Sequence, residues 1–140
     1  MADVRSTSGA AMAVAASALK AQQARMRVIA ENIANANSIA AEKGGDPYRR
    51  KVPVFAPQKM DSGASGVRMT RVRADQGEFK TEYDPGNPAA DEKGYVKLPN
   101  IDPLIEALDM REAQRAYEAN LNVIETARAM DSRTLDLLKR

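Results

Sequence analysis

The chain has 140 residues, of which 44% are hydrophobic and 29% charged, a composition typical of one ordinary folded domain or of an elongated subunit with a small domain attached. It contains no Cys and no His, which excludes thiol chemistry, disulfides, imidazole general bases and the usual zinc and haem ligand sets. Only two Phe, four Tyr and no Trp are present, so the apolar side chains are small and suit close helix packing better than a thick core.

The net charge is +2, but the charges are distributed unevenly along the chain. Residues 1–42 contain four bases and three acids, residues 43–80 contain nine and four, and residues 81–140 contain eight and twelve, so the three balances are +1, +5 and −4. A basic middle and an acidic last part favour complementary contacts between copies of the chain or with neighbouring proteins.

The start of the chain is rich in alanine but has no signal-peptide pattern. It lacks the order of charged residues, apolar core and cleavage site, and no apolar run reaches about 18 residues, the length that a transmembrane helix needs. We therefore expect neither a cleaved signal peptide nor direct insertion into a membrane.

The first predicted element is an amphipathic helix from about Ser6 or Ser8, whose hydroxyls can cap its start, to about Asn35. Apolar side chains recur every seven residues along it, which is typical of a coiled-coil seam. A helix of ~28 residues is about 42 Å long, a rod rather than an element of a compact domain. The residues expected to contact other helices are Met12, Leu19, Met26, Ile29 and Ile33.

Three asparagines crowd together at the end of this helix, in the stretch VIAENIANANSIAA. Asparagine is poor in a helix interior because its amide competes for backbone groups, so the cluster indicates a helix end or a specific role. One interpretation is a frayed end with Asn at the C-cap positions, where the left-handed conformation is tolerated. In the other, Asn32 and Asn35 share a helix face, and their buried or interfacial amides fix the helix exit and bridge to backbone groups of adjacent subunits, while Asn37 keeps the cap role and turns the chain.

Glycines and prolines interrupt every helical pattern in the middle of the chain, which predicts loops and short strands. The candidate strands are Val52–Phe55, Val67–Arg73, Glu78–Tyr83 and Tyr95–Leu98.

The same middle segment is rich in bases, which raises the question of nucleic-acid binding. We see no recognition motif and few aromatic residues among the bases, so a nucleic-acid partner is not expected. We expect instead a solvated basic surface that meets acidic parts of neighbouring copies. Its members are Arg49, Arg50, Lys51, Lys59, Arg68, Arg71 and Arg73.

The last predicted element is a long helix with a clear start. Pro99 and Asn100 form a turn, Asp102 can cap the helix, and Pro103 fits the first helical position, so we expect the helix to continue nearly to Arg140. Its apolar residues fall on two adjacent seams, which predicts more than one partner helix. The residues expected at interfaces are Met110, Tyr117, Asn120, Leu121, Val123, Ile124, Ala127, Met130, Leu135 and Leu138.

Carboxylates spaced along this helix, such as Asp109 with Glu112, are better interpreted as exposed helix charges than as an acid/base pair. Catalysis also needs a pocket and a stabilising group, and no motif marks either. We therefore expect no enzymatic activity and no catalytic, metal-binding or cofactor-binding residues.

Four stretches carry a resemblance to a known family: MRVIAENIANANS, PYRRKVPVF, GYVKLPNIDPLIE and AQRAYEANLNVIETARAM. They are similar to the flagellar basal-body rod proteins of the axial family, and within it most to a proximal-rod member. The resemblance implies a mainly α fold. Long N- and C-terminal helices pair in it as an antiparallel coiled-coil-like hairpin, with a small β or irregular insert between them.

The resemblance also implies domain boundaries, partners and a location. Residues 1–40 and 100–140 are expected to form the inner coiled-coil domain of a helical tube, with residues 41–99 as an insert outside it. The expected partners are copies of the chain, other rod proteins, basal-body adaptor proteins and the flagellar type III export apparatus. The expected role is that of a structural subunit of the hollow rod that crosses the periplasm and transmits torque, without a cofactor. The alternative is a cytoplasmic coiled-coil adaptor or nucleic-acid-associated protein that uses the basic middle segment.

Overall fold

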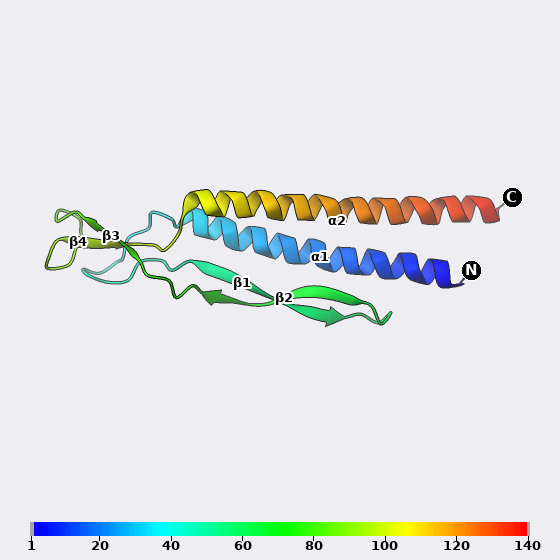
Figure 1. Cartoon of the computed structure of the whole chain (residues 1–140), viewed down its shortest axis with the longest axis horizontal. Coiled ribbons are helices and arrows are strands. Elements are labelled where there is room, and N and C mark those ends of the chain that lie inside the picture. Colours follow the sequence, from blue (N-terminus) through cyan, green and yellow to red (C-terminus); the bar gives the residue numbers. More distant parts are fainter. Residues whose placement is uncertain (1, 140) are drawn as a thin grey trace. The chain divides into compact units, whose positions relative to one another are not determined.

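The computed structural model describes residues 2–139, with side chains described from Thr7 onward. The elements along the chain are α1 (Ala2–Ala34), β1 (Lys51–Lys59), β2 (Ser65–Ala74), β3 (Lys80–Tyr83), β4 (Tyr95–Leu98) and α2 (Pro103–Leu138) (Figure 1). Two terminal helices with a small β or irregular insert between them were expected, and the structure confirms this arrangement, with an insert that contains two two-stranded sheets. Each of the four candidate strands overlaps an observed strand.

The helix α1 has 33 residues and begins earlier than expected, at Ala2. Ser8 is therefore not its cap. Its hydroxyl instead donates to the carbonyl oxygen of Ala127 over 3.4 Å, and the side chain of Ser6 lies outside the described side chains. The helix ends at Ala34, and its last turn tightens, because the N–H of Asn35 bonds the carbonyls of both residues 31 and 32.

The start of α2 follows the sequence signal. The Asp102 carboxylate accepts the N–H of Leu104 at 3.0 Å, and Pro103 is the first helical residue. The first intrahelical bond runs from the Glu106 N–H to the Asp102 carbonyl. The helix continues for 36 residues, which corresponds to about 54 Å. Within residues 2–139, no helix is long and apolar enough to cross a membrane.

The structure divides into two compact units, and each unit contains parts of both helices and of the insert. The first consists of Met1–Arg25, Val54–Arg71 and Glu112–Arg140, and the second of Met26–Pro53 and Val72–Arg111. The boundaries expected from sequence, 1–40, 41–99 and 100–140, follow the elements rather than these units and stay a prediction.

In the first unit, α1 lies between α2 and the hairpin of β1 and β2 (Figure 1). The two helices run in opposite directions there, because Ser8 contacts Ala127 whereas Arg25 lies 3.6 Å from Glu112. On the hairpin side, the buried Ser17 hydroxyl donates to the Val14 carbonyl at 2.7 Å and accepts the N–H of Val67 at 3.1 Å.

Gly66 allows the hairpin to approach α1 this closely. A Cβ at Gly66 would lie 2.5 Å from the Ser17 hydroxyl oxygen and 2.3 Å from the terminal methyl of Met60. The hairpin itself closes through a bond from the Met60 N–H to the Ala64 carbonyl at 2.9 Å, with Gly63 at a φ of 84° in its turn. A side chain at this position would force Met60 or Ser17 to move, so glycine suits the close approach of β2 to the helix.

In the second unit, β3 and β4 form an antiparallel pair in which Tyr83 lies opposite Tyr95 and Glu82 opposite Val96. Val96 is almost completely buried and packs with Ala89 and Ala90 of the connecting segment. This small cluster explains why a turn-rich segment is ordered.

Candidate functional site

The buried Asn32 joins the end of α1 to the start of β1. Its Oδ1 accepts the N–H of Lys51 at 2.9 Å, and its Nδ2 donates to the carbonyl oxygen of the same residue at 2.9 Å. The hydroxyl of Tyr48 donates to Oδ1 at 3.2 Å. The amide therefore pairs with Lys51 as a strand backbone would, which uses both its acceptor and its donor within the chain.

Asn32 was expected to face a neighbouring subunit, and the structure corrects this, because the residue is only 1% exposed and its amide is already paired. Asn35 is half-buried; its amide donates to the Glu31 carbonyl at 2.9 Å and accepts from the Ser38 hydroxyl at 3.0 Å. Asn37 is exposed, but among the described residues only glycines have positive φ, so it does not form a left-handed cap.

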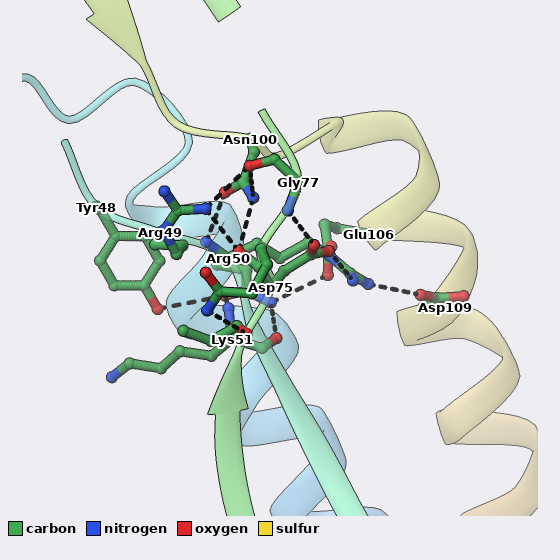
Figure 2. Close-up of polar contacts among 12 residues, drawn as sticks. Tyr48, Arg49, Arg50, Lys51, Asp75, Gly77, Asn100, Glu106 and Asp109 are labelled. Atoms are coloured by element: carbon green, nitrogen blue, oxygen red, sulfur yellow. Dashed lines mark hydrogen bonds and ion pairs between the residues drawn. The ribbon is translucent and has the colours of Figure 1, made fainter. Parts of the chain in front are cut away.

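A buried carboxylate lies beside Asn32. Glu106 is 1% exposed, and its Oε2 is 3.4 Å from the Asn32 amide nitrogen. Its other oxygen accepts the Nε–H of Arg50 (Figure 2). Burial of a carboxylate without such partners lowers the free energy of unfolding by on the order of several kcal/mol. Glu106 therefore needs these contacts to stay inside the fold.

Arg50 connects three carboxylates from two segments. Besides Glu106, its guanidinium lies 3.2 Å from Asp75 and 3.7 Å from Asp109 (Figure 2). Burial alone lowers the pKa of Arg50, but the hydrogen bond and charge of Glu106, followed by those of Asp75, outweigh it and raise the pKa above its ordinary value. We call Asn32, Arg50, Lys51, Asp75 and Glu106 the polar joint.

Asp75 is the member of the polar joint that directly follows β2. Its carboxylate accepts the N–H of Gly77 at 2.8 Å, and its own N–H donates to the Arg50 carbonyl at 2.8 Å. The pKa of Asp75 is lowered, first by the bond from Gly77, which outweighs the small effect of burial, and then by Arg50. Its carbonyl oxygen accepts from Arg49 at 2.8 Å and from the Asn100 amide at 3.1 Å (Figure 2).

The structure separates the bases that were expected to form one surface. The guanidinium of Arg49 lies 4.1 Å above the Phe79 ring, and Arg50 is held within the polar joint, so the expectation of a solvated surface is wrong for both. The ammonium of Lys51 lies 3.3 Å from Glu31. The exposed bases that remain on the hairpin are Lys59, Arg68, Arg71 and Arg73.

The residues expected at helix interfaces fall into two groups. One group is buried or half-buried within the chain and consists of Met12, Leu19, Met26, Ile29, Met110, Tyr117, Asn120, Ile124 and Ala127. The other is exposed and consists of Ile33, Leu121, Val123, Met130, Leu135 and Leu138. The structure adds exposed apolar residues near the start of α2 that were not expected at interfaces: Leu104, which is 69% exposed, Ile105 and Leu108.

An apolar groove of about 340 Å³ lies in the first unit where α1 and α2 meet. Its walls include Ala11, Ala127 and Met130, and Thr7 and Thr134 lie at it as well. Exposed apolar residues beside a groove are typical of a surface that contacts another protein. We use the name open face of α2 for the exposed apolar residues of this helix, which are Leu104, Ile105, Leu108, Leu121, Val123, Met130, Leu135, Leu137 and Leu138.

Sequence reasoning missed Glu106 as a member of the joint. An acidic residue in the first turn of a helix is common because of the helix dipole, so its presence there gave no sign of burial. Ser17 was missed for a similar reason, since a serine in an alanine-rich helix carries no signal of a contact with a strand 50 residues further along.

Comparisons with known proteins match both ends of the chain. A family model described as "Flagella basal body rod protein" matches residues 12–38. A second, described as "Flagellar basal body rod FlgEFG protein C-terminal", matches residues 92–137. The first match contains the three asparagines, and the second contains most of α2.

Full-length relatives extend this similarity over nearly the whole chain. The flagellar basal-body rod protein FlgC of Agrobacterium fabrum is 50% identical over 132 residues, which cover 93% of this chain and 94% of that relative. The protein of the same name from Escherichia coli O6:H1 is 43% identical over 125 residues, with 89% and 92% covered. That of Aquifex aeolicus is 42% identical over 131 residues, with 92% and 96% covered. These names describe a structural protein rather than an enzyme.

Proposed function

Because this chain belongs to the flagellar basal-body rod protein family and is a structural subunit of that rod, we propose that it assembles by packing the open face of α2 against helices of neighbouring subunits. Its place is the flagellar basal body, among other rod proteins. The observation that carries the proposal is that apolar side chains along α2 stay exposed in a chain whose polar joint is satisfied internally.

Within the chain, we propose that α1 and α2 pair as an antiparallel coiled-coil-like hairpin. In the first unit, Ser8 meets Ala127 and Arg25 meets Glu112; in the second, Asn32 meets Glu106. As the residue number along α1 rises, the number of the residue that it contacts in α2 falls, as an antiparallel pair requires. Buried and half-buried residues of α2 recur every three or four positions, with Asp109 and Ala116 beside them, which supports a seam along the helix: Glu106, Met110, Ala113, Tyr117, Asn120, Ile124, Ala127, Asp131 and Thr134.

The exposed apolar residues of α2 then contact helices of more than one neighbouring subunit, since they lie on several sides of the helix. Leu104, Leu108, Leu121 and Leu135 are each more than a third exposed, so burial of what remains exposed contributes a part of the about 1.5–3 kcal/mol that full burial of a leucine is worth. A tube of packed helices covers these side chains, whereas the isolated chain leaves them in water. Assembly is therefore driven mainly by apolar burial, without any catalytic step.

We further propose the finer setting from family membership. Residues 1–40 and 100–140 form the inner helical domain of the hollow rod, and residues 41–99 lie outside it. The chain crosses to the periplasm through the flagellum's own type III export apparatus and contacts copies of itself, other rod proteins and basal-body adaptor proteins. No cofactor and no nucleic acid take part, and the stiff packed helices transmit torque.

Cell fractionation tests this proposal. A tagged chain should copurify with detergent-extracted basal bodies and restore swimming to a strain that lacks its gene. The double variant Leu104→Ser, Leu108→Ser should lose both properties, whereas the control Ser132→Ala, Arg133→Ala, on exposed polar positions of the same helix, should keep them. The proposal fails if the chain stays in the cytosol or if the leucine variant swims normally.

A further inference from the structure

The hairpin of β1 and β2 carries bases that form no ion pair with the described side chains. Between residues 54 and 71 there are three bases, Lys59, Arg68 and Arg71, and one acid, Asp61. All three bases are exposed, and none of them forms an ion pair with a side chain between residues 7 and 139. We call Lys59, Arg68 and Arg71 the basic strip; it lies in the first unit.

The segment around β3 has the opposite charge. Residues 78–92 contain five acids and one base, a balance of −4, and the ammonium of that base, Lys80, is held 3.2 Å from the Ile101 carbonyl oxygen. Glu82 and Asp84 flank Tyr83 and are exposed. This segment belongs to the second unit.

Two exposed tyrosines lie opposite each other on β3 and β4, near these acids in the chain. Tyr83 is 65% and Tyr95 47% exposed, and their rings pack edge to face with centroids 5.3 Å apart. Aromatic rings that hold each other in place and still face water are typical anchors of protein interfaces. We call Glu82, Tyr83, Asp84 and Tyr95 the tyrosine tip.

We propose that the basic strip of one copy binds the tyrosine tip of a second copy. The proposal rests on the rod function proposed above and adds a contact by the insert to the helix packing. Glu82 and Tyr83 point to opposite faces of the strand pair, so guanidinium groups of the strip pair with the carboxylates on one face, and a guanidinium stacks on the tyrosine rings on the other. Tyrosine and arginine are also the residues that carry most binding energy at protein interfaces.

The opposite charges of the two surfaces identify the occupant as another copy. Each chain offers a strip to one neighbour and a tip to the other, so the contact is heterologous. Such a contact repeats from copy to copy and closes into a ring or continues as a helix, as a rod requires. A nucleic acid would neutralise the strip alone and would leave the tip without a partner.

Disulfide crosslinking tests the contact directly, since the chain has no cysteine of its own. We would introduce Arg71→Cys and Asp84→Cys together and oxidise isolated basal bodies. The proposal predicts disulfide-linked dimers and higher multimers for this pair, because strip and tip lie within bonding distance across copies. Each single variant, and the control pair Arg27→Cys with Asp84→Cys, should give none. Equal crosslinking by the control pair, or no multimers from the test pair, overturns the proposal.

Charge reversal gives an independent test. Arg68→Glu with Arg71→Glu should lower incorporation into basal bodies about tenfold, as should Glu82→Arg with Asp84→Arg, and all four changes together should restore it. These side chains are exposed, so the melting temperature of each variant should match that of the parent. Parental incorporation by the two double variants contradicts the contact. It is also contradicted if the parent binds to a DNA column, Arg68→Glu with Arg71→Glu no longer binds to it, and that variant still incorporates normally. If the unchanged chain is absent from basal bodies, the rod function itself has failed.

Discussion

Asn32 and Lys51 pair through two hydrogen bonds of 2.9 Å, although one residue lies in a helix and the other in a strand. The amide side chain presents an acceptor and a donor side by side, as a backbone peptide does, so it can take the place of a missing strand neighbour. Aspartate lacks the donor and leucine lacks both groups. This pairing fixes where the insert leaves α1, and it explains why an asparagine stands at a buried helix position.

Replacement of Asn32 by Leu should destabilise the isolated chain by about 3 kcal/mol. The change leaves the Lys51 N–H and carbonyl without partners, and each lost bond to a buried group costs about 1–3 kcal/mol. Urea unfolding followed by far-UV circular dichroism measures this. The control Asn37→Ala, at an exposed residue, should change the free energy of unfolding by less than about 0.5 kcal/mol. Equal stability of the two variants would contradict the role of the pair.

Arg50→Lys should also destabilise the chain, by about 2 kcal/mol or more. Lysine keeps the charge but cannot reach Glu106, Asp75 and Asp109 at once, and a buried ion pair that loses one partner is strongly destabilising. The same substitution at the exposed Arg68 is the control and should have little effect. Thermal unfolding of both variants decides the matter, and a Tm for Arg50→Lys equal to the parent's would show that the charge alone suffices.

Asp75 should make stability depend on pH in the acid range. The pKa of its carboxyl is lowered in the fold from the ordinary value of 3.8, chiefly by the Gly77 N–H, so the fold favours the charged form. That contribution is present above the unfolded-state pKa and is lost as pH falls through the folded-state pKa. Asp75→Asn should therefore be less stable than the parent at pH 7, and the gap should shrink as pH falls below about 4. A gap that stays constant from neutral to acid pH would exclude this linkage.

Gly66→Ala should loosen the hairpin from α1. The new methyl group would lie 2.5 Å from the Ser17 hydroxyl oxygen, and rotation of that hydroxyl away from it would break its bonds to the Val14 carbonyl and the Val67 N–H. Hydrogen exchange at the Val67 amide should become faster, with a loss of about 1–2 kcal/mol in stability. Gly9→Ala is the matched control, since nothing lies within 4 Å of its added carbon, and it should stabilise α1 by about 0.5–1 kcal/mol. Slower exchange at Val67 in Gly66→Ala would refute the close approach.

Features with a local cause could be predicted from the sequence. Asp102 followed by Pro103 marks the start of α2 because both act on the adjacent backbone, and the four strands lie between turn residues. The partners of the polar joint could not be predicted in this way. Asn32 meets Lys51 19 residues later and Glu106 74 residues later, and no local preference encodes such distant contacts.

The seven-residue repeat of apolar residues likewise predicted only part of the buried side of α1. Ile33 continues the seven-residue repeat but is 39% exposed, whereas its neighbour Asn32 is buried. An α-helix drifts by about 20° per heptad relative to a strict repeat, so the last member of the seam turns outward. The start of α1 was misplaced because the Ser8 hydroxyl, a good cap in isolation, serves a contact with Ala127 instead.

The central claim is that the open face of α2 contacts neighbouring rod subunits while the polar joint is complete within each chain. A density map of purified basal bodies at side-chain resolution tests it most directly. We predict that Leu104, Leu108 and Leu135 are covered by helices of other subunits and that Asn32 still bonds Lys51 of its own chain. Leucines that face solvent in the assembled rod, or an Asn32 amide that bonds a neighbouring subunit, would contradict the account.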